Sequence, residues 1–248
     1  MSDKSTADRG RRLSDKSRAS DGRAGDVWLR PQRVTRDTPP LSRKRIVTAA
    51  IALLDEEGVD RLTMRRLAQR LDTGSTTLYW HVDTKNDVLD LVLDELFAEV
   101  DLPEPSTAQN WTTTIVALLN GWRAAMLRHP WSATLLGRPM LGPNVLARTE
   151  FLHATLAGAG FTPPHLTAAA YALANYVTGA ALSQTAWQNH TGGEIYEPAN
   201  HLLQERSDSY PVLATLGFMA DNDWDGNFER GLRYLLDGIA AARPISER

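Results

Sequence analysis

The sequence predicts an all-α protein. After residue 41, apolar residues recur at three- and four-residue spacing in most segments, which is the period of an amphipathic helix. No segment alternates apolar and polar residues as a half-buried strand would, and Pro and Gly separate the helical stretches. The chain has 248 residues, of which 42% are hydrophobic, so it is long enough to bury a core in one large domain or two smaller ones.

Residues 1–40 are expected to form a disordered basic tail. Residues 1–26 are rich in Ser, Asp, Arg, Lys and Gly and hold almost no large apolar side chain, so burial cannot offset the entropy of ordering them. The next stretch adds Val27, Trp28 and Leu29 to a basic background. Pro39-Pro40 ends any helix before residue 41.

The first expected helix follows Ser42, a plausible N-cap, and ends near Gly58, which is suited to the C′ position. Its apolar stripe is formed by Ile46, Ala49, Ala50, Leu53 and Leu54. A second, short helix begins at Thr63, also a plausible N-cap, and presents Leu67, Ala68 and Leu71 on one side.

A sharp turn follows at residues 71–75, LDTGS, because Asp72 tolerates a left-handed backbone and Gly74 supplies a second permissive position. The third helix is expected over 75–81. Thr84 and Asp87 resemble a capping box that opens a fourth helix, expected over 84–100 and closed by Pro103.

Three short helices with a turn of a few residues between the second and third form a helix-turn-helix, which we place at residues 41–87. Leu78 and Val82 are expected to point inward, whereas Tyr79, Trp80 and His81 need not follow them. The helix start is expected to enter a DNA major groove, with small hydroxyls near base edges and Tyr79 and His81 near phosphates.

Three structural alternatives to DNA contact stay open here. Trp80 can serve as a hydrophobic wedge between helices, and Arg65 and Arg66 can form a solvated face. The basic stretch 27–36 can reach the minor groove as an arm or remain an unbound linker.

Charge is divided unevenly along the chain, whose net charge is −3. Residues 1–40 hold ten Lys/Arg against six Asp/Glu, residues 41–85 hold eight against six, and residues 86–248 hold nine against eighteen. A basic N-terminal third and an acidic remainder are expected when one end meets a polyanion, although a solvated tail before an acidic domain gives the same division.

The strings RIVTAAIALLDEEG, LTMRRLAQRL and TTLYWHV resemble the TetR family of transcriptional repressors, most specifically over residues 41–100. Tetracycline-binding members carry a base-reading glutamine where this chain has Ser75, so the operator sequence is not transferred. The resemblance assigns DNA-contacting positions, with Ser75 included as a candidate, to Arg65, Ser75, Thr76, Thr77, Tyr79, Trp80, His81 and Lys85.

The resemblance continues more loosely into residues 88–248, which it implies are a helical ligand-binding and dimerisation domain. Helices are expected at 109–128, 131–137, 143–159, 164–190 and 225–242, and residues 191–223 are turn-rich with one short helix near 199–206. The last helix carries an apolar stripe that fits either a dimer interface or the core of a single chain. The stripe consists of Phe228, Leu232, Leu235, Leu236 and Ile239.

Tetracycline-binding members hold their drug through a magnesium ion bound by histidine, but the matching stretch here reads ATLLGRP, with Leu135 at the expected histidine. A tetracycline–magnesium ligand is therefore not expected, and no metal or cofactor is predicted. Aromatic and polar residues are candidates to line an apolar cavity, although each can equally be a core residue. The candidates are Trp111, Trp122, Met126, Trp131, Leu135, Tyr171, Asn175, Tyr176 and Trp187.

Several other classes of function are not expected. The chain has no cysteine, no G-x-S-x-G, no H-E-x-x-H and no phosphate-binding Gly loop, so an enzyme is not predicted. His190, Glu194, Glu197 and His201 fit no zinc spacing and are interpreted as a polar loop. The start has no apolar signal region and the apolar run 167–182 is too short to span a bilayer, so a cytoplasmic location is expected.

These observations predict a ligand-responsive transcriptional repressor that binds a palindromic double-stranded DNA operator as a homodimer and is released by a small-molecule inducer. Helix 84–100 is expected to connect the two halves. One alternative is a DNA-binding regulator without an inducer, whose C-terminal half only dimerises, and another is an adaptor that uses the same fold to bind protein.

Overall fold

The computed structural model describes residues 23–29, 41–104, 110–135, 137–191, 196–216 and 223–243. Helices account for the regular structure of these residues, and no strand occurs among them, as the sequence predicts. The chain divides into two compact units. The first unit comprises residues 1–101 and 134–150, and the second comprises residues 102–133 and 151–248.

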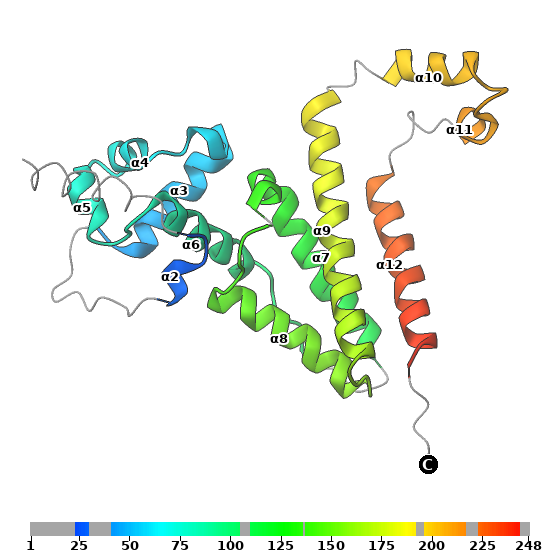
Figure 1. Cartoon of the computed structure of the whole chain (residues 1–248), viewed down its shortest axis with the longest axis horizontal. Helices are drawn as coiled ribbons and strands as arrows, with labels where there is room; N and C mark the ends of the chain where they lie inside the picture. Colours follow the sequence, from blue (N-terminus) through cyan, green and yellow to red (C-terminus); the bar gives the residue numbers. More distant parts are fainter. Residues whose placement is uncertain are drawn as a thin grey trace, which may run out of the picture. The chain divides into compact units, whose positions relative to one another are not determined.

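The first unit contains a small helical bundle, coloured blue to green in Figure 1. Its elements are α2 (Asp26–Leu29), α3 (Arg43–Glu57), the 3₁₀ turn η1 (Val59–Arg61), α4 (Met64–Arg70), α5 (Ser75–Tyr79) and α6 (Lys85–Ala98). Helix α3 packs against α4 and α6, and α4 packs against α5. Its largest fully buried side chains are Phe97, Ile46, Leu54, Leu62, Leu67, Leu78 and Leu96.

The helix starts follow the capping signals of the sequence. The Ser42 and Thr63 side chains accept hydrogen bonds from the backbone N–H groups of Arg45 and Arg66. Thr84 and Asp87 form the predicted capping box at the start of α6. Gly58 ends α3 with φ of 77°, a backbone conformation that favours glycine.

Residues 23–29 differ from the expected disordered tail. Asp26–Leu29 form α2, which packs against α6, and Gly25 is buried. The compact unit also continues through α6 to Asp101 and takes in residues 134–150, beyond the expected domain end at residue 87. The remaining residues of the 1–40 tail lie outside the described part of the chain.

The segment 134–150 is fastened to α6 by polar contacts. The Asp94 carboxylate accepts the backbone N–H groups of Asn144 and Val145 at 2.9 and 3.0 Å, at the start of α8 (Pro143–Gly158). Burial raises the pKa of Asp94, while these hydrogen bonds act in the opposite direction. Further along, the Arg148 guanidinium donates to the carbonyl oxygen of Val100 at 2.7 Å, just after α6 ends.

The second unit is built on three long helices that lie side by side in Figure 1: α7 (Trp111–Arg128), α9 (His165–Thr191) and α12 (Trp224–Ala241). Helix α9 packs against both α7 and α12. Two short helices, α10 (Tyr196–Glu205) and α11 (Pro211–Leu216), pack against each other in the turn-rich region, where one short helix was expected. The expected helix over 131–137 is instead the 3₁₀ segment η2 (Pro130–Leu135), which begins in the second unit.

Helix α12 carries one apolar stripe, whose residues differ in burial. Phe228, Leu232 and Leu236, spaced four residues apart, are buried within the chain, whereas Leu235 and Ile239 are only half-buried. The core interpretation of the stripe is therefore confirmed for Phe228, Leu232 and Leu236, and the dimer interpretation stays a prediction. The first three belong to the core, and the other two leave apolar surface exposed.

None of the described helices combines the length and apolar composition needed to cross a bilayer.

Candidate nucleic-acid interface and small-molecule region

The turn between α4 and α5 gives the helix-turn-helix its geometry. Asp72 has φ of 51°, the left-handed conformation predicted for it, and the Thr73 N–H donates to the carbonyl of Ala68 at 3.0 Å. Gly74 has φ of −73° and serves as the N-cap of α5, so this glycine supplies no left-handed conformation. One permissive residue is therefore enough to reverse the chain.

Helix α5 buries one side and exposes the other. Leu78 is fully buried and Val82 is buried beyond the helix end, as expected for the inward positions. Ser75, Thr76 and Thr77 are exposed, and Tyr79 and Trp80 are 46% and 69% exposed. Exposed aromatic surface of this kind often marks an interaction site, so this edge is available to a binding partner.

Lys85 and His81 lie next to this edge and are half-buried. The Lys85 ammonium donates to the carbonyl oxygen of Val59 at 3.1 Å, which fixes the side chain against η1. An ammonium has three N–H donors, so two remain for a phosphate oxygen.

The arginines of α4 divide into paired and unpaired ones. Arg66 pairs with Glu57 and Arg70 pairs with Glu56 of α3, and the Arg70 hydrogen bond lowers the pKa of Glu56. Arg65 is exposed and has no ion pair among the described residues. The solvated-face interpretation therefore suits Arg66, whereas Arg65 is free to contact an anion.

Sequence reasoning did not assign a role to the basic start of α3, where Arg43, Lys44 and Arg45 are exposed. Cations at a helix N-terminus oppose the helix dipole. The sequence signal was the RKR run directly after the Ser42 cap.

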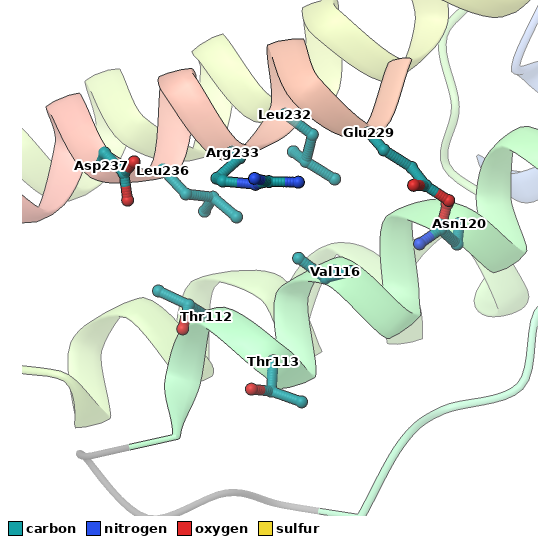
Figure 2. A pocket seen from close by; sticks show the side chains of 9 residues that line it. All are labelled: Thr112, Thr113, Val116, Asn120, Glu229, Leu232, Arg233, Leu236 and Asp237. Carbon is teal, nitrogen blue, oxygen red and sulfur yellow. The ribbon is translucent and has the colours of Figure 1, made fainter. Parts of the chain in front are cut away.

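The second unit holds a hollow of about 370 Å³ between α7 and α12. Figure 2 shows Val116 of α7 facing Leu232 and Leu236 of α12, with Glu229 and Asp237 toward opposite ends. The remaining lining residues are polar: Thr112, Thr113, Asn120 and Arg233. An apolar floor with a polar rim is the composition common in small-molecule sites.

None of the nine predicted ligand residues lines this hollow. Several instead pack in ring pairs within the second unit. Trp111 meets Phe161 edge to face at 5.4 Å between ring centroids, Tyr176 stacks on Phe228 at 5.3 Å, and Trp187 lies 6.5 Å from Trp224.

The other predicted ligand residues fall into three places. Trp122, Met126 and Trp131 are buried in the second unit, and Leu135 is buried in the first. Tyr171 is 71% exposed, and Asn175, one turn further along α9, is exposed as well. These two residues point away from the buried side of α9 and do not line an interior cavity of the single chain.

A buried cation that sequence reasoning missed joins the three long helices. The Arg123 guanidinium of α7 donates to Oε1 of Gln184 in α9 at 2.5 Å, pairs with Asp225 of α12 at 2.8 Å and lies 4.7 Å over the Phe228 ring. Among the residues that the structure describes, its Nε has no hydrogen-bond partner. Periodicity could not reveal this cluster, because its members are far apart in the sequence.

A second depression, of about 320 Å³, lies between α9 and α12. Small residues form much of it, including Ala168 and Ala172 of α9 and Gly238 of α12, and the 70%-exposed Tyr234 stands at its side. Its lining is mostly apolar, with His165 and Tyr234 as the polar side chains, and it includes no lysine or arginine.

Part of the segment interpreted as a polar loop is helical. Glu197 and His201 lie on α10, and His201 pairs with Glu205 at 3.5 Å, whereas the side chains of His190 and Glu194 fall outside the described residues. Among the described side chains, no group of three or more His, Cys, Asp or Glu is placed to hold a metal ion.

Residues 46–92 match the family described as "Bacterial regulatory proteins, tetR family", and residues 103–243 match "Tetracyclin repressor-like, C-terminal domain". An HTH-type transcriptional regulator of Saccharopolyspora erythraea is 44% identical over 228 residues, covering 91% of this chain and 96% of the relative. The chain belongs to the TetR family of transcriptional regulators.

Further TetR-family relatives agree. The HTH-type transcriptional repressor DrrR1 of Streptomyces coeruleorubidus is 33% identical, covering 86% of this chain and 82% of the relative. The crystal structure of the Streptomyces coelicolor TetR family protein ActR in complex with actinorhodin is similar with a TM-score of 0.75 and 33% identity, covering 84% of this chain and all of that chain. The helix-turn-helix of the first unit is thus that of a DNA-binding regulator, and the second unit corresponds to the family's C-terminal domain.

Proposed function

We propose that this TetR-family protein is a repressor that binds a palindromic operator as a homodimer and is released by a small molecule. The observation that carries the DNA part is the sidedness of α5. Leu78 and Val82 are buried, so Tyr79 and Trp80 can stay exposed without loss of the fold.

The proposed DNA contacts follow from the chemistry at this edge. Ser75, Thr76 and Thr77 have short hydroxyl side chains that approach base edges closely, and Tyr79 and His81 reach phosphate oxygens. Trp80 supplies apolar contact next to them. Lys85, held by Val59, and the unpaired Arg65 supply positive charge.

A homodimer is proposed because a five-residue reading helix offers few base contacts, which a two-fold axis doubles on a palindromic site. The surface proposed for the dimer is formed by α9 and α12. There Tyr171 and Tyr234 are 71% and 70% exposed, and the depression beside Tyr234 is lined by alanines and a glycine, which permit close approach of another helix.

The inducer part of the proposal is supported by the C-terminal domain match and by the ActR structure that contains actinorhodin. Leu135 stands where tetracycline-binding members have a histidine, so a tetracycline–magnesium complex is not proposed. The proposed ligand residues are three of the buried members of the predicted group, Trp122, Met126 and Trp131, with the half-buried Tyr176 and Trp187.

Selection of bound duplexes from random double-stranded DNA tests the DNA part. The wild-type chain should enrich an inverted repeat whose half-sites lie about one helical turn or a multiple of it apart. Tyr79→Ala should abolish the enrichment, whereas Tyr210→Ala, which alters a tyrosine of equal exposure in the second unit, should not. Failure to enrich any sequence, or equal loss in both variants, would contradict the proposal.

A regulator without an inducer is the second candidate. The ring pairs formed by Trp111, Tyr176 and Trp187 favour it, because side chains used in packing are not free to line a cavity. Actinorhodin is the first probe that separates the two candidates. If it binds, operator affinity should fall about 5- to 150-fold, the usual range of such coupling. Demonstrable binding with unchanged operator affinity would favour the second candidate.

A further inference from the structure

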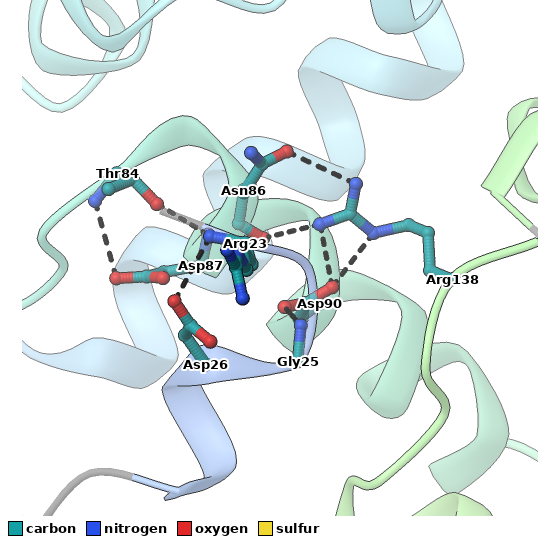
Figure 3. A network of polar contacts seen from close by, with 8 residues as sticks. All are labelled: Arg23, Gly25, Asp26, Thr84, Asn86, Asp87, Asp90 and Arg138. Carbon is teal, nitrogen blue, oxygen red and sulfur yellow. Dashed lines mark hydrogen bonds and ion pairs between the residues drawn. The ribbon is translucent and has the colours of Figure 1, made fainter. Parts of the chain in front are cut away.

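Residues 23–29 lie against α6 as a short strap that neither family match covers, since these begin at residues 46 and 103. The strap has internal structure. The Arg23 N–H donates to the Asp26 carboxylate at 3.0 Å, and the Trp28 N–H donates to the carbonyl of Gly25 at 3.1 Å. Figure 3 shows the Arg23–Asp26 hydrogen bond and Gly25 next to Asp90 of α6.

Gly25 is the residue through which the strap reaches α6. Its N–H donates to Oδ2 of Asp90 at 2.5 Å, across 65 residues of sequence. Its φ is +89°, and a Cβ at this position would lie 3.1 Å from Cβ of Pro139. The backbone conformation therefore favours glycine, and an added Cβ would press against Pro139.

Asp90 joins this strap to the segment before α8. Its side chain is 1% exposed, Oδ1 accepts a hydrogen bond from Arg138 Nε at 2.8 Å, and Arg138 Nη2 lies 2.7 Å from Oδ1 in an ion pair. With Oδ2 bound to Gly25, each oxygen of the buried carboxylate has a donor. A buried charge that loses a donor is destabilised, so the strap stabilises the Asp90–Arg138 pair.

Arg138 also ties down the first turn of α6. Its Nη1 donates to the side chain of Asn86 at 3.1 Å, and its Nη2 donates to the Asn86 backbone carbonyl at 3.0 Å (Figure 3). Asn86 directly follows Lys85, one of the proposed DNA contacts. Strap, Arg138 and the start of α6 thus form one connected network beside the helix-turn-helix.

We propose that residues 23–29 position the helix-turn-helix for operator binding. Through Gly25 they keep Asp90 paired with Arg138. This pair fixes α6 against residues 137–148 in the conformation that binds the operator. The inference rests on the proposed function. Asp90, Arg138 and Gly25 are positioning residues, because they act through α6 and not by touching DNA. Release of the strap weakens operator binding because α6 becomes free to adopt other orientations.

Two variants release the strap in different ways. Gly25→Ala places a methyl group against Pro139 and strains the backbone, and Gly160→Ala is its matched control, with a similar φ of +92° and no atom near the added Cβ. In the second variant, a Gly/Ser linker of equal length replaces residues 23–29, RAGDVWL. This replacement leaves the net charge at −3, because Arg23 and Asp26 cancel.

Amide hydrogen exchange of the full chain is the first measurement and needs no DNA. Both strap variants should increase the exchange rates of α6 and of Asn144 and Val145, while Gly160→Ala leaves them unchanged. Operator affinity, measured with the DNA recovered by selection, should fall about fivefold or more in both strap variants. Failure of the wild-type chain to recover DNA would contradict the proposed function and leave the exchange result standing.

A double-mutant cycle distinguishes positioning from general support of the fold. If the strap acts through Arg138, the linker variant combined with Arg138→Ala should bind the operator no more weakly than Arg138→Ala alone. Additive losses, faster exchange without loss of operator affinity, or no change in either measurement would each overturn the inference.

Discussion

The exposed aromatic side chains of α5 and those of α9 and α12 are alike in exposure and differ in their neighbours. Tyr79 and Trp80 stand beside threonine hydroxyls, His81 and Lys85. Tyr234 lines a depression together with alanines, a glycine and the half-buried Leu235 and Ile239, and Tyr171 lies between two alanines in the sequence of α9. Exposure alone indicates that a partner is expected, and the surrounding side chains indicate what kind of partner it is.

The neighbours of each surface suit a different partner. Hydroxyl, imidazole and ammonium groups match phosphates and base edges, so the α5 surface fits a nucleic acid. Small apolar residues allow helices to approach closely, and the depression between α9 and α12 includes no lysine or arginine, so the α9–α12 surface fits a second copy of the chain. The comparison can be tested because the two kinds of contact respond differently to salt, charge and truncation.

The largest expected difference between the two surfaces is the response of their contacts to salt. If the dimer makes six to ten phosphate contacts, operator affinity should fall roughly a thousandfold or more between 50 and 200 mM salt. The dimer should persist over the same range, because apolar contacts are not screened. Affinity titrations and sedimentation at each salt concentration measure the two responses, and a flat operator response would remove the distinction.

Alanine substitution should lower the unfolding free energy at the buried side of α5 much more than at its exposed side. Leu78→Ala should cost about 2–5 kcal/mol of unfolding free energy, because it leaves a cavity at a fully buried position. Leu53→Ala in α3 should cost a similar amount. Tyr79→Ala should change stability by about 0.5 kcal/mol or less. Denaturant unfolding measures all three, and a large loss for Tyr79→Ala would place that ring in the core.

A charge on α12 should break the proposed dimer. Tyr234→Glu should weaken self-association by about 2 kcal/mol or more, because the carboxylate would be buried among apolar groups. Tyr210→Glu, at an exposed tyrosine outside α9 and α12, is the control. Sedimentation equilibrium distinguishes them, and an unaffected dimer in Tyr234→Glu would assign the interface to another surface.

Single cations next to α5 should have the smallest effects. Arg65→Ala and Lys85→Ala should each weaken binding to all DNA sequences alike and reduce the salt dependence by about one charge. Arg66→Ala should leave DNA binding and its salt dependence nearly unchanged, because Glu57 already pairs with Arg66. Equal effects at residues 65 and 66 would mean that the pairing within α3 and α4 does not select the DNA-contacting arginine.

Local signals made most helices and caps predictable. Ser42, Thr63 and the Thr84–Asp87 box act within a few residues of themselves, so their roles could be inferred from spacing. The inward positions of Leu78 and Val82 follow from helical periodicity in the same way. The exposure of Tyr79 and Trp80 could be predicted because these rings fall between the inward positions.

The features that could not be predicted depend on partners distant in sequence. Helix α2 is too short to stand alone and is held by Asp90, whose position the tail sequence does not reveal. Arg123 is buried because α9 and α12 bring Gln184 and Asp225 to it. The sequence shows that residues 171 and 187 are aromatic. It does not show that the Tyr171 ring faces outward or that the Trp187 ring packs against Trp224, because both depend on tertiary packing.

The carboxylate of Asp94 that accepts the first N–H groups of α8 has a consequence for building chimeric regulators. A Cβ at Gly142 would lie 2.1 Å from Oδ1 of Asp94, so the acid and the glycine form a matched pair contributed by two stretches of chain about fifty positions apart. A hybrid joined near residue 87 would take residue 94 from one parent together with residue 142. A hybrid joined between α6 and α8 would mix the parents at this pair, and it should fold well only where both parents carry the same acid and glycine.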